Sequence, residues 1–307
     1  MSEPRIVIIG AGMAGIACAR ALSDAGIPPI VVDKGRSPGG RMSTRRVEGF
    51  AFDHGAQFFT ARGAAFRAAV SSAMASGAVA AWEDGSGAED PHHVGLPGMS
   101  GMVKHLVAGL DVRYGIEITS VRAADSGWVL EHADGTLEAD TVICTAPLPQ
   151  TRNLLGSHGM EAALAPVEMA PCWALLLGFE ASFEPGWSAR RSNGDLGWIA
   201  HDGSKPGRNG NSWVVHASPR WSREHLELSK EEATARLRDM LGDELGPLPK
   251  AAYAAAHRWR YAMVTKPLGQ PFLHTKSLFA GGDWALGPRV ECAFDSGHAI
   301  AKAVLES

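Results

Sequence analysis

The sequence of 307 residues has few cysteines and no excess of charge of one sign. The 4 cysteines lie far apart and form no Cys-x-x-Cys pair, which excludes a local zinc knuckle or redox dithiol and favours a reduced, cytoplasmic protein. The 29 Lys and Arg residues against 33 Asp and Glu residues leave a formal net charge of −4. This balance gives no electrostatic reason to expect nucleic acid or an anionic membrane as a partner.

Long apolar runs and common catalytic signatures are also missing. The first apolar run covers only residues 6–9, which is too short for a signal-peptide core, and no later run approaches the roughly 18 residues of a membrane span. The 12 histidines show no His-Glu-x-x-His spacing, and no Gly-x-Ser-x-Gly elbow occurs. We therefore expect no export, no membrane span, no metal and no hydrolase chemistry.

Glycine and tryptophan are plentiful. The 36 glycines make up about 12% of the chain, where roughly 7% is usual. The 9 tryptophans outnumber the 3 tyrosines. With 45% apolar and 20% charged residues, the chain has the composition of a globular protein with a sizeable core. At roughly 150 residues per domain, the length predicts about two domains.

The N-terminal segment has the pattern of a strand, a tight glycine turn and a helix. An apolar, β-branched run at residues 6–9 (IVII) ends at a glycine triplet within residues 10–15 (GAGMAG), and helix formers follow to residue 25. Gly10 permits the turn, Gly12 lets backbone amides approach a pyrophosphate, and Gly15 allows close packing of helix and strand. This pattern predicts a dinucleotide-binding site.

A second apolar run, residues 30–32, ends at Asp33, which lies 18 residues after Gly15. A carboxylate at this place accepts hydrogen bonds from the adenosine ribose. The same charge would repel a ribose 2′-phosphate, so NADP is disfavoured and both NAD and FAD remain open.

The next segment separates these two cofactors. Residues 34–42 (KGRSPGGRM) add a second glycine pair followed by Arg41, which a simple nicotinamide dehydrogenase does not need. The segment resembles the Gly-Gly-Arg signature of the FAD-dependent amine oxidase class, where Arg41 would supply a fixed cation to the pyrophosphate.

The other end of the chain has the form of a second flavin-binding segment. Residues 278–284 (LFAGGDW) read as a short strand that delivers Gly282 and Asp283, whose carboxylate would accept from ribityl hydroxyls. Residues 289–297 lead into a final helix predicted over 300–305. The N-terminus of this helix would stabilise the negative charge that builds on a reduced flavin.

The middle of the chain contains a third strand of the same domain. Residues 141–147 (TVICTAP) read as a strand beside the first one, and residues 116–121 and 128–131 as a meander with an Asp-Gly turn at 134–135. In relatives the backbone near Ile118 holds the adenine, an assignment that depends on resemblance alone.

Rarer segments then extend the resemblance over the whole chain. They are residues 53–60 (DHGAQFFT), 95–100 (GLPGMS), 204–208 (SKPGR), 213–217 (WVVHA) and 257–262 (HRWRYA). With them the chain resembles the bacterial renalase family, a branch of the FAD-dependent amine oxidase superfamily. The resemblance implies an α/β chain (α+β overall) of p-hydroxybenzoate-hydroxylase-like fold, with a Rossmann-type FAD-binding domain and an antiparallel-sheet substrate domain. It also implies noncovalent FAD and the oxidation of 2- and 6-dihydro isomers of NAD(P)H to NAD(P)⁺, with O2 reduced to H2O2.

The predicted domains are discontinuous in sequence. The FAD-binding domain comprises residues 1–60, 97–150 and 272–307, and the substrate domain comprises residues 61–96 and 151–271. In the substrate domain, residues 172–179 and 212–216 read as strands of an antiparallel sheet, and residues 222–241 as one helix with a capping box midway.

Two groups of site residues follow. For the cofactor they are Gly10, Ala11, Gly12, Met13, Ala14, Gly15, Asp33, Lys34, Gly40, Arg41, Met42, Gly55, Ala56, Gln57, Phe58, Ile118, Thr145, Gly282, Asp283, Arg289, Val290 and Glu291. For catalysis they are Gln57 near the edge of the flavin ring, Trp259 and Tyr261 as walls, and His257 orienting a carboxamide. Core packing is the alternative for the last three.

The chemistry itself requires little of the side chains, because a dihydronicotinamide has no O–H to deprotonate and the flavin takes the hydride. The expected partners are a small dihydronicotinamide substrate and O2, without nucleic acid or membrane. Lys205 and Arg208 would meet substrate phosphates or lie in a solvated loop, and Cys292, where relatives have glycine, most simply fills space. The alternatives are an amine or porphyrinogen-type oxidase and a flavin-bearing sensor or binding protein.

Overall fold

The computed structural model describes residues 5–307, which form two compact units. Unit 1 contains the chain up to Gly40 together with Val103–Met169 and Val264–Ser307, and unit 2 contains Arg41–Met102 and Ala170–Met263. The chain passes between the units four times, so each unit is assembled from segments that are distant in sequence.

Unit 1 is built on a parallel sheet. Its strands are β1 (Ile6–Ile9), β2 (Ile30–Asp33), β7 (Asp111–Tyr114), β8 (Ser120–Ala123), β9 (Trp128–His132), β10 (Gly135–Ala139), β11 (Thr141–Cys144), β17 (Phe272–Thr275) and β18 (Leu278–Gly281). Its helices are α1 (Met13–Asp24), α4 (Leu148–Leu155), η2 (Gly156–His158), α5 (Glu161–Leu164), α8 (Asp283–Leu286) and α9 (Val290–Leu305).

The main sheet of unit 1 has the strand order β17-β18-β11-β1-β2-β7. All neighbours are parallel except β17, which is antiparallel to β18. β1 is buried along its whole length, which is why it reads as an unbroken apolar run. Because β1 lies between β2 and β11, the chain reverses its winding direction there, and ligands bind at the carboxyl ends of strands at such a switch point.

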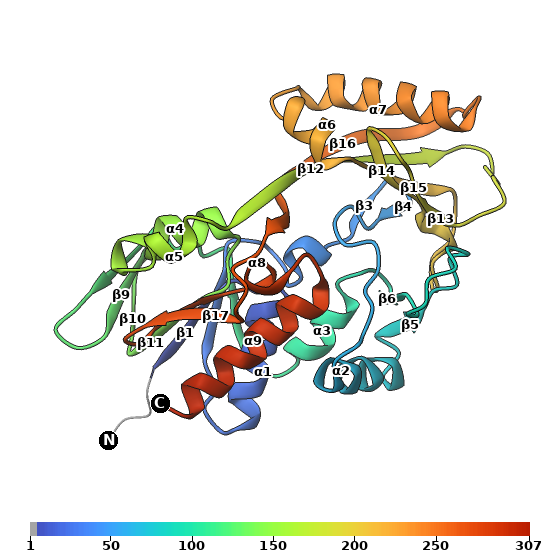
Figure 1. Ribbon diagram of the computed structural model, residues 1–307. Coiled ribbons are helices and arrows are strands. Elements are labelled where there is room, and N and C mark those ends of the chain that lie inside the picture. Colours follow the sequence, from blue (N-terminus) through green and yellow to red (C-terminus); the bar gives the residue numbers. More distant parts are fainter. Residues whose placement is uncertain (1–4) are drawn as a thin grey trace. The chain divides into compact units, whose positions relative to one another are not determined.

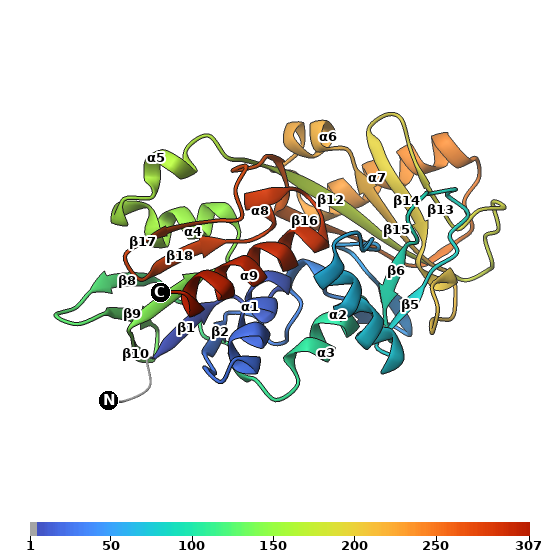
Figure 2. The ribbon, with the colours of Figure 1, turned by 60° about the horizontal axis from the view of Figure 1, so that its bottom comes forward.

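Layers cover both faces of this sheet. On one face, an apolar core joins β1, β11 and β18 to the antiparallel three-stranded sheet β10-β9-β8 and to helices α4 and α5. Helices α1 and α9 lie side by side (Figure 2), and a Cβ at Gly297 would lie 2.0 Å from the carbonyl oxygen of Ala14. Only glycine allows so close an approach of two helix backbones.

Unit 2 is built on an antiparallel sheet of order β13-β14-β15-β12-β16. Its strands are β3 (Arg45–Val47), β4 (Phe50–Phe52), β5 (Val79–Ala81), β6 (His93–Gly95), β12 (Glu168–Phe179), β13 (Ala189–Arg191), β14 (Leu196–His201), β15 (Ser212–Ala217) and β16 (Ala251–Lys266), of which β12 and β16 run across the unit boundaries. Its helices are α2 (Ala64–Ala75), η3 (Asp202–Ser204), α6 (Pro219–Glu224) and α7 (Lys230–Leu245); η1 (Gly40–Met42) and α3 (Gly101–Val107) span boundaries.

The two faces of the five-stranded sheet have different cores. Helices α6 and α7 cover one face (Figure 1), where Leu237 and Leu241 pack on Trp173 and Trp213. On the other face, Phe52 of β4 packs against Leu176 and Val214. These observations confirm the predicted α/β class, with a Rossmann-type unit and a second unit built on an antiparallel sheet.

The boundaries of the units differ from the predicted domain boundaries. Residues 41–60 and 97–102 belong to unit 2, because β4 packs on the five-stranded sheet of that unit. Residues 151–169 and 264–271 belong to unit 1, because α4 and α5 complete its core. The assignment of FAD to unit 1 and of substrate to unit 2 stays a prediction.

Two helix predictions were wrong in extent. The final helix begins at Val290 rather than Ile300, and it includes Gly297, whose lack of a side chain permits the close approach to Ala14. The single helix predicted over 222–241 is two helices, α6 and α7. The capping box of Ser229 and Glu232 is present, but it marks the start of α7.

Within residues 5–307, no helix is both long and apolar enough to span a membrane. The same residues contain no cluster of three or more His, Cys, Asp or Glu side chains arranged to hold a metal ion.

Candidate functional site

The glycine turn after β1 lies at the carboxyl end of the central strand of unit 1. The Gly10 amide donates to the Val32 carbonyl at 2.8 Å, and Gly10 has a φ of +109°. The Thr145 hydroxyl donates to the carbonyls of Ile9 and Gly10 at 3.0 and 3.2 Å. Thr145, which follows β11, therefore ties the ends of two neighbouring strands together beneath the turn.

The turn fits a pyrophosphate. A Cβ at Gly12 would meet nothing within 4 Å, so the space above this residue is open. The Gly39 amide donates to the Ala11 carbonyl at 3.0 Å, and Gly40 lies against Gly12. Helix α1 begins at Met13 with no side-chain cap and no acid in its first turn, so its first backbone amides can donate hydrogen bonds to an anion.

Asp33 closes the same site from β2. Its carboxylate accepts from the backbone amides of Ala11 and Gly35, each at 2.6 Å. A carboxylate has about four acceptor positions, so it can still accept from a ribose hydroxyl. Lys34, also predicted for the cofactor, points its amine to the carboxylate of Glu117 at 3.1 Å in an exposed ion pair.

The C-terminal residues predicted for the cofactor lie around the starts of α8 and α9. Gly282 has a φ of +148°, and its amide donates to the Ser296 hydroxyl at 2.8 Å. Asp283 is the first residue of α8. Arg289 precedes α9, and its guanidinium lies 3.5 Å from the buried carboxylate of Glu291 in the first turn of that helix.

Ile118 is buried in the core beneath the three-stranded sheet, and its backbone lies just before β8. Cys292 is a buried, free cysteine in the first turn of α9, and its sulfur would lie 3.5 Å from a Cβ at Gly287. This close packing agrees with the expected space-filling role.

Unit 2 brings the other predicted residues together along one segment, residues 54–58. The Ala56 amide donates to the Arg41 carbonyl at 2.8 Å, and a Cβ at Gly55 would collide with the same carbonyl. The Arg41 guanidinium donates to the Ala262 carbonyl of β16 at 2.9 Å. Met42, the residue after Arg41, is buried. The ring of Phe58 packs on Trp198 with 5.3 Å between the ring centroids.

Three imidazoles and an indole line the neighbouring face of β16. His54 stacks on Trp259 at 5.1 Å and meets His257 edge-on at 4.7 Å. The carbonyl of His54 accepts from Trp259 Nε1 at 2.8 Å and is 3.2 Å from His216 Nε2. The predicted wall residue Trp259 thus contacts His257, which was predicted to orient a carboxamide, whereas the second predicted wall residue, Tyr261, is 37% exposed.

These imidazoles are neutral at neutral pH. Burial lowers the pKa of His216 to about 4. Burial, followed by the charges of His54, Arg45 and Lys230, also lowers the pKa of His257 to about 4. Burial is likewise the main reason why the pKa of His54 lies below its ordinary value.

The stability of the protein is expected to fall as the pH is lowered from 6.5 toward about 4. In this window the unfolded imidazoles bind protons and the folded ones do not, so acid favours unfolding. The melting temperature measured across this range checks the expectation. His257→Gln, which removes one such group, should flatten the slope. An unchanged slope would contradict the assignment.

A cluster of four buried charges fixes the start of the same segment. Asp53, Asp202, Lys205 and Arg208 all have side chains at most 2% exposed. The Asp53 carboxylate is 3.1 Å from the Lys205 amine and 2.6 Å from the Arg208 guanidinium. Asp202 pairs with both cations as well. The cluster is therefore neutral overall, as buried charges require.

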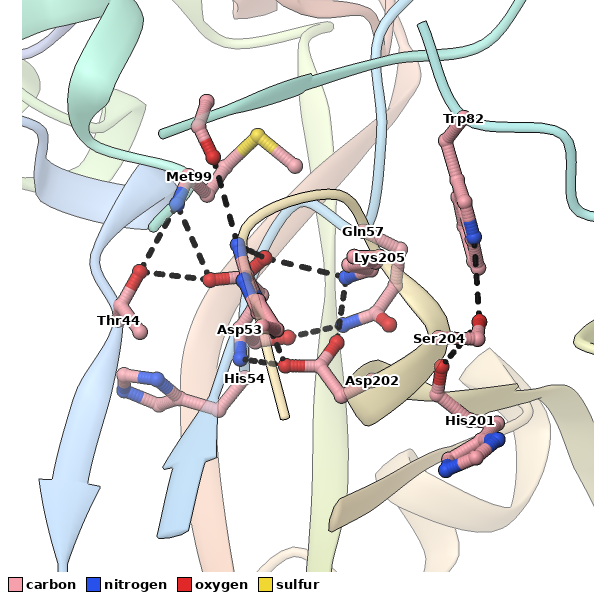
Figure 3. Close-up of polar contacts among 12 residues, drawn as sticks. Thr44, Asp53, His54, Gln57, Trp82, Met99, His201, Asp202, Ser204 and Lys205 are labelled. Atoms are coloured by element: carbon pink, nitrogen blue, oxygen red, sulfur yellow. Dashed lines mark hydrogen bonds and ion pairs between the residues drawn. The ribbon is translucent and has the colours of Figure 1, made fainter. Parts of the chain in front are cut away.

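Polar contacts of Asp53 extend the cluster to other segments of unit 2 (Figure 3). Its amide donates to Asp202 at 2.7 Å, and its carboxylate accepts from the Thr44 hydroxyl at 2.6 Å and the Met99 amide at 3.1 Å. The Gln57 side-chain amide donates to its carbonyl. Gln57, one of the predicted catalytic residues, is consequently buried and held by the cluster.

The sequence did not indicate this arrangement. Lys205 and Arg208 were expected to meet phosphates or to lie in a solvated loop, and they do neither within unit 2. Burial pairs them with Asp202, three residues before Lys205, and with Asp53. The spacing of one acid and two bases within residues 202–208 was the available signal, but spacing does not reveal burial.

Comparisons with known proteins agree over most of the chain. A family model described as flavin containing amine oxidoreductase matches residues 63–305, and one described as NAD(P)-binding Rossmann-like domain matches residues 8–71. Renalase of Mus musculus is 28% identical over 317 aligned residues, which cover 91% of this chain and 92% of that protein.

Solved structures share the fold. Cyclohexylamine oxidase from Brevibacterium oxydans IH-35A superposes with a TM-score of 0.78 at 13% identity and covers 99% of both chains. Putrescine oxidase bound to putrescine superposes with a TM-score of 0.77 at 14% identity and covers 100% of both chains.

Proposed function

Since this chain belongs to the flavin containing amine oxidoreductase family and is an FAD-dependent oxidoreductase, we propose that it oxidises the 2- and 6-dihydro isomers of NAD(P)H to NAD(P)⁺, with O2 reduced to H2O2. Renalase, which resembles this chain over nearly its full length, is the relative that motivates the substrate class.

The observation that carries the proposal is the positive charge around the group formed by His54, His257 and Trp259. Arg45 and Lys230 are the cations that depress the pKa of His257 after burial and His54, and neither has an ion-pair partner within residues 5–307. The acid next to His54, Asp53, is neutralised by Lys205 and Arg208. These surroundings favour an anionic dinucleotide over an ammonium group.

The residues of unit 1 would hold FAD noncovalently. The open turn at Gly12, the second glycine pair and the amides that begin α1 receive the pyrophosphate, and Asp33 receives the adenosine ribose. Bound FAD supplies the redox chemistry, which is acceptance of a hydride and transfer of electrons to oxygen. Such chemistry requires no strong base for the substrate carbon.

The residues of unit 2 would position the substrate. The flat faces of His54 and Trp259 are suited to pack against a dihydronicotinamide ring, and their neutral state avoids repulsion of the pyridinium product. His257 would orient the carboxamide through a ring nitrogen, while Gln57 stays fixed by the Asp53 carbonyl.

The holoprotein is expected to lose its flavin absorbance near 450 nm, a wavelength general to flavins, when mixed anaerobically with 2- or 6-dihydro isomers of NADH. Authentic 4-dihydro NADH should produce no comparable bleaching, since its hydride lies on a different ring carbon. Stopped-flow absorbance measures both rates. If no isomer bleaches the flavin, the proposed function is wrong.

An amine substrate is the alternative, because Trp259 and Tyr261, two residues apart on β16, would also accommodate a neutral amine and the solved structures of this fold include amine oxidases. In that case the protein should release H2O2 when it is given amines and oxygen, and it should release none with the dihydronicotinamide isomers. Peroxide release from both classes would indicate a broad oxidase.

A further inference from the structure

A buried serine of α9 joins three segments of unit 1, one of which is predicted for the cofactor. Ser296 has no solvent exposure. Its hydroxyl accepts from the Gly282 amide at 2.8 Å and donates to the Pro271 carbonyl at 2.6 Å. One side chain therefore connects α9 to the turn between β18 and α8 and to the loop before β17.

This serine accounts for the two glycines that precede Asp283. A Cβ at Gly281 would lie 2.5 Å from the Ser296 hydroxyl oxygen, so glycine leaves room for the hydroxyl. Gly282 has a φ of +148°, which other residues rarely adopt, and its amide is held in this conformation by Ser296. Because Asp283 follows directly, the conformation of Gly282 determines where Asp283 lies at the start of α8.

The turn at Gly282 is also attached to the glycine turn at the other end of the chain. Trp284 Nε1 donates to the Ala146 carbonyl at 3.1 Å. Ala146 follows Thr145, whose hydroxyl donates to the carbonyls of Ile9 and Gly10. The N-terminal and C-terminal segments predicted for FAD are consequently neighbours within unit 1.

The residue after Ser296 determines how closely α9 approaches α1. A Cβ at Gly297 would collide with the backbone of Ala14, which lies in the first turn of α1, two residues after Gly12. Figure 2 shows the two helices side by side. Adjacent residues of α9 thus contact both segments, since Ser296 holds Gly282 and Gly297 lies against α1. This pair fixes the position of one segment relative to the other.

FAD would contact both segments, whereas ADP would contact only one. The adenosine and the pyrophosphate, which the two ligands share, would lie at Asp33 and the glycine turn. The ribityl chain, which only FAD has, would reach the carboxylate of Asp283. Displacement of Asp283 should therefore weaken the binding of FAD and spare that of ADP, because a contact that is no longer preorganised contributes less to affinity.

We propose that Ser296 is a positioning residue of the FAD site, which holds Gly282 and thereby places Asp283 for the ribityl chain. The hydroxyl of Ser296 is engaged by Gly282 and Pro271, so its effect passes through the backbone and not through a contact with FAD. The inference rests on the placement of FAD in unit 1 that the proposed function includes, and it is independent of the substrate.

Ser296→Ala is expected to weaken FAD binding by about 10-fold and to leave ADP binding within about twofold of the parent. The Gly282 amide loses its acceptor in this variant, so Asp283 is no longer held in place, while the glycine turn and Asp33 are unchanged. Calorimetric titration of the FAD-free, full-length protein with each ligand gives the two dissociation constants.

Ser222→Ala is the matched control. Ser222 is equally buried, and its hydroxyl accepts from the Trp173 amide at 3.1 Å in unit 2. This variant loses a comparable hydrogen bond, so its melting temperature should also fall, but the ratio of FAD affinity to ADP affinity should stay parental. Gly282→Ala, which strains the backbone at a φ of +148°, should reproduce the selective loss of FAD.

The inference is overturned if Ser296→Ala loses FAD and ADP affinity by the same factor, if it loses neither, or if Ser222→Ala shows the same selective loss. Should Ser296→Ala fail to fold, Gly282→Ala decides the question, and a parental affinity ratio in that variant overturns the inference. No substrate enters these titrations. Failure of every dihydronicotinamide isomer to reduce the flavin would contradict the proposed reaction and leave this result unchanged.

Discussion

Gly12→Ala is expected to give a folded protein that binds FAD about 100-fold more weakly, which corresponds to about 2.7 kcal/mol. A Cβ at Gly12 meets nothing within 4 Å, and its φ of −78° suits alanine, so the fold itself loses nothing. The added methyl group instead occupies the space through which backbone amides would approach the pyrophosphate. The ratio of flavin to protein absorbance and the melting temperature of the apoprotein measure the two effects.

Gly15→Ala is the informative partner of this variant. Its Cβ would lie 1.9 Å from the carbonyl oxygen of Gly10, so β1 and α1 would have to separate. Overpacking of this kind costs about 1–3 kcal/mol, and FAD binding should fall together with stability. Gly242→Ala, in open space within α7, should retain FAD and gain up to about 1 kcal/mol. Gly12→Ala with parental FAD affinity would exclude a pyrophosphate above the turn.

Lys205→Met is expected to destabilise the protein by about 3–5 kcal/mol at pH 7, because it leaves two buried carboxylates with one cation. Asp53 and Asp202 have no solvent exposure, and Arg208 cannot neutralise both. Equilibrium denaturation in urea measures the loss. Lys250→Met removes the cation of an exposed pair with Glu180 and should change stability by less than about 1 kcal/mol.

The deficit of Lys205→Met should shrink as the pH is lowered. Burial raises the pKa of Asp202, and loss of Lys205 raises it further, so the folded variant takes up a proton there before the unfolded chain does. Proton uptake by the folded state favours folding as pH falls. In the parent, Lys205 and Arg208 outweigh burial and lower the pKa of Asp53, and loss of Lys205 weakens this lowering, so Asp53 also takes up a proton more readily in the variant than in the parent. A deficit that grows in acid would contradict this account of the cluster.

Much of unit 1 could be predicted from local patterns. β1, β2, β11 and β18 read as short apolar runs because parallel strands are buried on both faces. The glycine triplet and Asp33 marked the turn because a pyrophosphate site requires glycine where backbones approach closely. The start of α9 was missed. Glycine is required at position 297 because the backbone of Ala14 in α1, near the other end of the chain, lies against it, and no local pattern shows this contact.

The charged residues of unit 2 could not be placed in this way. Asp53 and Asp202 are 149 residues apart, and nothing local distinguishes Lys205 from a solvated lysine. Asp84 and His92 lie in a glycine-rich stretch for which the sequence predicts no such contact, yet burial turns them into a hydrogen-bonded pair. Burial decides the state of such groups, because the cost of removing a charge from water forces it to find a partner or to lose its charge.

The sequence by itself thus determined the strands, the glycine turn and the class of cofactor, all of which depend on neighbouring residues and on backbone sterics. The tertiary structure alone decided which acids and bases are buried together, which histidines stay neutral, and that His92 has a carboxylate partner. These properties depend on contacts between distant segments, and the dielectric surroundings that such contacts create are not written in any local pattern.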